Sequence, residues 1–149
     1  MKDKVDKISF ELGMINCFVE MVACGVKKLA ISPPISPEDY KQIAPLSDEI
    51  VNGFRVNSYL EKNLLITDLQ SEDFTKNKWS ILYYRDDKVL KAYMKLKENK
   101  EDLDRKGEYD ISAKEKISRD FMELLSYPKK IIEEKLAQSA PSDPFVLKD

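Results

Sequence analysis

Two thiols and a carboxylate near the N-terminus are the residues of this sequence best suited to metal or redox chemistry. Cys17, Glu20 and Cys24 stand at positions i, i+3 and i+7, which loosely share one side of a helix. A structural metal site needs four ligands and closely spaced cysteine pairs, and the chain has no other Cys and no His to complete one. Because a buried free thiol behaves as a small apolar group, we predict that both cysteines pack in the core and that no metal or cofactor is bound.

Histidine is absent from the chain, and its absence excludes several mechanisms. Ser-His and Cys-His nucleophilic catalysis, His-ligated zinc or haem, and His-based pH switches all require it. Adjacent carboxylates such as Asp86-Asp87 are numerous, but they suit helix starts and solvated faces better than acid-base pairs. The four glycines are too dispersed to form a phosphate-binding loop. The sequence therefore favours a non-enzymatic protein over a small enzyme.

A row of basic residues is the most suggestive charged feature. On a continuous helix these residues would lie opposite the apolar side, and Tyr84 among them could stack on a base while the cations contact phosphates. A solvated helix face explains the same pattern, and the net charge of -2 gives no general attraction to a polyanion. We therefore expect no nucleic-acid partner and keep polyanion binding as a weaker alternative. The basic row comprises Lys78, Arg85, Lys88, Lys91 and Lys95.

Methionine and aromatic residues offer a second candidate site, for an apolar ligand. Met-rich aromatic surfaces adapt to such ligands, although the same residue types more often form ordinary core. The candidate ligand-binding residues are Met14, Met21, Trp79 and Tyr93.

The C-terminal tail offers a third candidate site, for a protein partner. It carries three consecutive apolar residues beyond two prolines, on a segment too short to form its own core. Such a segment can dock into a groove on the same molecule or on a neighbour, or it can be a frayed terminus. The candidate docking residues are Phe145, Val146 and Leu147.

The apolar periodicity predicts a central helix over residues 8–29. Its apolar residues form two sets on nearly opposite sides, so both faces must be covered. Glu11, Glu20 and Lys27 interrupt the stretch, and a carboxylate within a bilayer costs several kcal/mol, so we expect no membrane span. The second apolar face, available to a second copy of the chain, comprises Phe10, Met14, Cys17, Met21 and Cys24.

A second helix is predicted over residues 37–52. Ser36 is its N-cap and Pro37 its first residue, Pro45 should kink or split it, and Asn52-Gly53 supplies a left-handed cap. The alternative makes Asn52-Gly53 a hairpin turn between strands at 49–51 and 54–56.

Residues 77–106 permit two interpretations. A three-four rhythm of apolar residues predicts one long helix, capped by Gly107. The alternative is a strand over 79–84, paired with 63–69, followed by a shorter helix with Asp86 as N-cap. Farther on, Ser112 and Glu115 form a capping box that opens a helix, Pro128 breaks it, and a last segment reaches about residue 138.

These features together predict a mainly α, single-domain bundle of four or five helices around the N-terminal helix, with one short two-stranded β element as an option. Residues 1–140 form the helical domain and 141–149 the tail. Two cysteines and the lack of a cleavable signal indicate the cytoplasm. The expected function is a protein-interaction or regulatory module that forms a homodimer. The alternative is a helical pocket protein or small enzyme that binds an apolar or aromatic small molecule.

Overall fold

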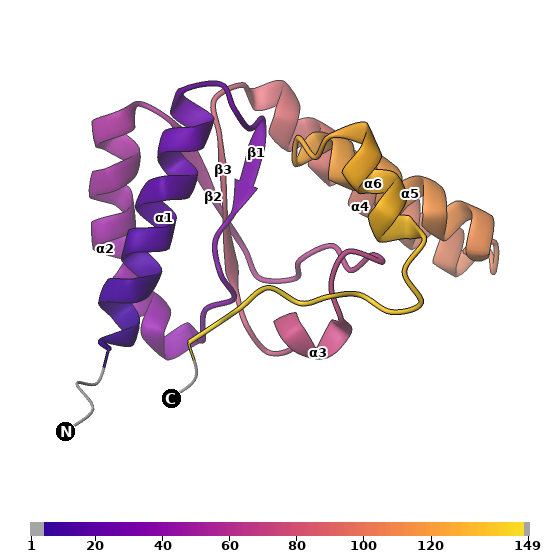
Figure 1. Cartoon of the computed structure of the whole chain (residues 1–149), viewed down its shortest axis with the longest axis horizontal. Coiled ribbons are helices and arrows are strands. Elements are labelled where there is room, and N and C mark those ends of the chain that lie inside the picture. The colour runs from indigo at the N-terminus through magenta and orange to yellow at the C-terminus, as the bar shows by residue number, and fades with distance from the viewer. Residues whose placement is uncertain (1–4, 148–149) are drawn as a thin grey trace.

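The computed structural model describes residues 5–147, which form three layers (Figure 1). A three-stranded antiparallel sheet lies in the centre, with α1 and α2 on one side and α4, α5 and α6 on the other. The elements in chain order are α1 (Lys7–Ala23), β1 (Leu29–Ile31), α2 (Pro37–Phe54), β2 (Asn57–Glu61), α3 (Glu72–Thr75), β3 (Ser80–Tyr84), α4 (Asp87–Arg105), α5 (Ile111–Leu124) and α6 (Lys129–Leu136).

Strand β3 explains why the core has two halves. Side chains alternate across a strand, and all five residues of β3 are buried. Ile81 and Tyr83 pack with α1 and α2, whereas Leu82 and Tyr84 pack with the α4–α6 layer. A strand covered on both faces needs apolar residues at successive positions, which accounts for the unbroken run from Ile81 to Tyr84.

The sheet has the order β1-β3-β2, with β3 antiparallel to both neighbours. Tyr84 pairs with Leu29 on one side and with Asn57 on the other. Beyond β1, the backbone amide of Ser32 donates to the Ile81 carbonyl, and Ile35 forms an isolated bridge with Trp79. The chain leaving β1 therefore stays beside β3 until α2 begins.

The prediction of a mainly helical chain is confirmed, because 56% of the described residues are helical, but the helical bundle is not. The described part has six helices and three strands, so the fold is mixed. The long helix over 77–106 is wrong, and its alternative is confirmed in part: β3 comes first, and the Asp86 carboxylate then caps α4 by accepting from the Lys88 amide. The strands beside β3 are β1 and β2, whereas residues 63–69 form no strand.

Helix α1 ends six residues earlier than the periodicity suggests. Gly25 adopts a left-handed φ of 78°, and the Val26 amide donates to the Met21 carbonyl at 2.9 Å, as in a helix-terminating turn. The chain then enters β1, so Leu29 belongs to the sheet. The prediction of buried thiols is also wrong, because Cys17 and Cys24 are free and exposed.

Helix α2 begins as predicted, with Ser36 as N-cap and Pro37 in the first turn. Pro45 lies within the helix without splitting it, and Gly53 is an ordinary helical residue. The left-handed cap is Arg55, at a φ of 57°, because the helix extends to Phe54. The hairpin alternative at Asn52-Gly53 is therefore wrong.

Replacing Arg55 by Gly should stabilise the protein by about 1 kcal/mol, because the left-handed conformation is costly for any residue with a Cβ. Urea unfolding measures the difference. The matched control is Arg105→Gly inside the last turn of α4, which should destabilise by up to about 1 kcal/mol, since helical glycine is unfavourable. If both variants shift stability in the same direction, the backbone argument fails.

The C-terminal helices begin and end close to where the sequence predicts, and one of the predicted caps is a different residue. Asp110, rather than Ser112, caps α5, and its carboxylate accepts from the Ala113 amide at 2.8 Å. The break at Pro128 is confirmed, since Ser126 takes a φ of 67° and α6 begins at Lys129. Gly107 caps α4 as predicted, at a φ of 68°.

Candidate functional site

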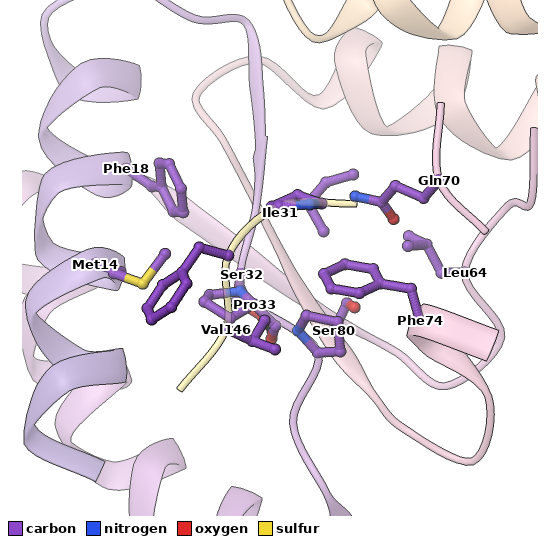
Figure 2. Close-up of a pocket in the computed structure, with 13 residues that line it drawn as sticks. Met14, Phe18, Ile31, Ser32, Pro33, Leu64, Gln70, Phe74, Ser80 and Val146 are labelled. Atoms are coloured by element: carbon purple, nitrogen blue, oxygen red, sulfur yellow. Dashed lines mark hydrogen bonds between the residues drawn. The ribbon is translucent and has the colours of Figure 1, made fainter. Parts of the chain in front are cut away.

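An apolar pocket beside α1 is the best candidate site, because segments far apart in the sequence converge on it (Figure 2). Helix α1 contributes Met14 and Phe18, which lie one turn apart and share a face. The chain around the end of β1 contributes Ile31 and the two prolines that follow Ser32, and the segment before β3 contributes Leu64 and Phe74. The cavity has a volume of about 70 Å³.

The C-terminal tail forms the remaining wall of the pocket. Pro144, Phe145 and Val146 line it, and the tail runs back across the molecule from α6 to α1 (Figures 1 and 2). The Phe145 ring meets Phe10 of α1 edge-on, with the ring centroids 6.2 Å apart. Yet Phe145 is 71% exposed, so the tail covers the pocket without filling it.

A carboxylate anchors the tail just before the apolar residues. One oxygen of Asp143 accepts from the Ser71 amide at 2.8 Å, and the other accepts from the Ser71 hydroxyl at 2.5 Å. Both bonds are exposed, so water competes with them. The anchor therefore sets the position of the tail while adding little affinity.

The pocket is chemically suited to binding apolar groups. Its polar side chains are few, and the Ser32 hydroxyl is already engaged, because it donates to the Pro33 carbonyl and accepts from the Ile81 amide. Gln70 is the lining residue with a polar amide at the rim. This arrangement, mostly apolar with a few polar groups, is typical of a ligand or peptide site.

The four predicted ligand-binding residues are not brought together. Met14 lines the pocket, but Met21 lies two turns farther along α1 and is 39% exposed. Trp79 packs against Tyr40 of α2, with ring centroids 5.4 Å apart, and Lys62 lies over its ring. Tyr93 is fully buried in the α4–α6 half of the core.

Strand β3 separates the residues of the basic row. Lys78 and Arg85 flank the two ends of β3, while Lys88, Lys91 and Lys95 follow on α4, all with exposed side chains. A five-residue strand spans roughly 16 Å, so the first two cations cannot share one phosphate. Tyr84 is 6% exposed and is not available to stack on a base.

Sequence reasoning missed most of the pocket residues. Phe18, Ile31 and Phe74 lie on three elements, and their convergence depends on long-range pairing that no local pattern reports. Two signals existed, namely the Pro33-Pro34 pair, which forces an extended chain, and the apolar end of the tail. Of the predicted tail residues, Phe145 and Val146 line the pocket, and Leu147 is half-buried.

Apart from the apolar pocket, a cluster of polar side chains lies in the core, at the end of β2. One oxygen of Glu61 accepts from the Tyr93 hydroxyl and from Lys97 Nζ, each at 2.8 Å, and its other oxygen accepts from the Asn63 amide. The Tyr93 hydroxyl in turn accepts from the Leu65 amide at 3.0 Å. Burial raises the pKa of Tyr93, and the Glu61 carboxylate adds to that rise. Each group already has a partner, so the cluster is built to fix the fold.

Comparison of the chain with protein-family models, with curated proteins and with solved structures found no match. Within residues 5–147, no group of three or more Cys, Asp or Glu side chains is placed to hold a metal ion. None of the helices in that range combines the length and apolar character that a membrane span requires.

Proposed function

We propose that this protein is a protein-interaction module and that the pocket beside α1 is its binding surface. The observation that supports the proposal is the seating of the chain's own tail. A carboxylate held by Ser71 is followed, two residues later, by Phe145 and Val146 against an apolar pocket. The ligand we propose is an extended segment of a partner protein with the same order of groups, an acidic residue and then bulky apolar ones.

The tail acts in this proposal as a weak competitor for the pocket. Its tether gives it an effective concentration in the millimolar range, so it occupies the pocket in the absence of a partner when its dissociation constant lies well below that range, even though it binds far more weakly than a partner does. Its contacts are shallow, because Phe145 is 71% exposed and a cavity of about 70 Å³ remains. A partner segment that fills this cavity buries more apolar surface than the tail does and can displace it.

The remaining apolar cavity also favours a second candidate function, the binding of a small apolar molecule. Its lining of Met14, Phe18 and Phe74 offers the adaptable surface that such ligands use. A panel of metabolites tested by thermal unfolding separates the two functions, because a ligand that binds only the folded state raises Tm.

We further propose a cytoplasmic location, since both cysteines are free.

The test is binding of a fluorescent peptide with the tail sequence, residues 139–149, to the full chain carrying Phe145→Asp. This variant removes the apolar competitor, so it should bind the peptide at least about tenfold more tightly than the unaltered protein does. Fluorescence anisotropy measures the two dissociation constants.

A matched pair of variants on α1 locates the site. In the Phe145→Asp background, Met14→Glu places a charge in the pocket and should abolish peptide binding, whereas Met21→Glu lies outside the pocket and should leave it unchanged. Equal binding by the two variants, or no binding by Phe145→Asp itself, contradicts the proposed site.

A further inference from the structure

Strand β2 is an open edge of the sheet. The strand order β1-β3-β2 places β1 and β2 at the two edges, but only β2 is exposed. Leu29 and Ala30 of β1 have no exposed surface, whereas Asn57, Ser58 and Tyr59 of β2 are exposed, and Tyr59 by 39%. The outer side of β2 therefore presents backbone donors and acceptors that a further strand can pair with.

The composition of β2 does not block such pairing. Proteins protect edges with proline, with bulges or with charges pointing into the sheet, and β2 has no proline and an unbroken five-residue register with β3. The strand holds one charged residue, Glu61, and this carboxylate is buried and bound to Lys97. An approaching strand therefore meets no unpaired charge within β2.

We propose that β2 pairs antiparallel with β2 of a second copy of this chain, about a two-fold axis at Tyr59. Identical strands can always pair in this way, because the same patch serves both subunits. In this register Tyr59 faces Tyr59 of the second copy, Ser58 faces Leu60, and Asn57 faces Glu61, so no like charges are opposed. Aromatic residues directly opposite on adjacent strands stabilise a sheet, and the exposed Tyr59 ring gains a partner.

This interface is independent of the pocket beside α1. Strand β2 contributes no residue to that pocket, whereas Ile31 of β1, at the other edge of the sheet, does. The interface also replaces the dimer surface expected on α1, because the tail covers part of that surface at Phe10 and Met14. A pair of five-residue strands buries less area than a standard interface, so the dimer should dissociate on dilution.

The test uses the two-fold axis, which places Tyr59 of one copy opposite Tyr59 of the other. Tyr59→Glu opposes two carboxylates across the axis and Tyr59→Lys opposes two ammonium groups, so each variant alone should dimerise at least about tenfold more weakly than the unaltered protein. A 1:1 mixture of the variants opposes Glu to Lys and should recover the dimer. Analytical ultracentrifugation over a range of concentrations measures the mass.

The controls are the same substitutions at Ile111, which is 87% exposed on α5 and outside the interface. Ile111→Glu and Ile111→Lys should dimerise as the unaltered protein does. The proposal is overturned if the unaltered protein is monomeric at every concentration, if both Tyr59 variants dimerise normally, or if their mixture is no more dimeric than either alone.

Discussion

Above about pH 10 the protein should lose stability steeply as the pH rises, because two tyrosines are buried in its core. Burial raises the pKa of Tyr83 and of Tyr93 above the ordinary value of about 10. Above pH 10 the unfolded chain ionises these phenols, while the folded protein still holds both protons. The unfolded state then binds fewer protons, so the free energy of unfolding falls as pH rises.

Two such groups lower the free energy of unfolding by about 2.7 kcal/mol per pH unit, and by about 5 kcal/mol over two units. Burial also raises the pKa values of Tyr84, Tyr109 and Tyr127, which act in the same direction. Burial lowers the pKa of Lys27, which opposes the loss below its ordinary value of 10.5. Urea unfolding at a series of pH values measures the slope.

Tyr83→Phe provides the control for this prediction. It should reduce the slope by about 1.4 kcal/mol per pH unit, since one buried phenol is removed. At neutral pH it should cost about 1 kcal/mol, because the Ser47 hydroxyl loses its partner at 2.8 Å. A free energy of unfolding that stays constant from pH 9 to pH 12 would contradict the assignment.

Elements with a strong local signal were predictable from the sequence. The Ser36-Pro37 start of α2, the Gly107 cap and the break at Pro128 each depend on one or two residues whose backbone preferences hold in any context. The Asp86 cap was recognisable only as an alternative. Its apolar neighbours fit a strand and a helix equally well over so short a run, and the tertiary pairing of β3 decided the outcome.

The sheet edges and the pocket lacked such signals. Strand β1 has three residues, the first of which, Leu29, continues the apolar rhythm of α1, and the left-handed turn at Gly25 ends the helix before it. Strand β2 is largely exposed, so its side chains show little apolar alternation. The pocket requires α1, β1 and the 64–74 segment to converge, and that convergence is a consequence of the sheet order.

Replacing Lys97 by Met should lower the free energy of unfolding by about 2 kcal/mol at pH 7. The methionine keeps the apolar stem but leaves the buried Glu61 carboxylate without the cation that now lies 2.8 Å away. Uncompensated buried charges are among the costliest defects in a fold. We expect a smaller loss of stability than for breaking a fully buried ion pair, because the Lys97 side chain is 22% exposed and water can reach the site. Urea unfolding measures the loss.

Lys100→Met is the matched control, since Lys100 lies on the same helix and donates to an uncharged acceptor, the Ile66 carbonyl, at 2.9 Å. It should cost only about 1 kcal/mol, the net value of one hydrogen bond. Equal losses for the two lysine variants would show that the charge on Glu61 is not what makes Lys97 important.

The double variant Glu61→Gln/Lys97→Met isolates the electrostatic contribution of the Glu61–Lys97 ion pair to stability. Glutamine has nearly the shape of glutamate: its amide oxygen can still accept from the Asn63 amide and its NH2 group can donate to the Tyr93 hydroxyl, but it carries no charge that needs Lys97. The double variant should therefore be more stable than Lys97→Met alone, although Glu61→Gln by itself breaks the ion pair and should destabilise the protein. Such non-additivity is expected of residues that share an ion pair or a hydrogen-bond network. If the two substitutions add instead, the cluster stabilises the junction of β2 and α4 through packing rather than through its ion pair.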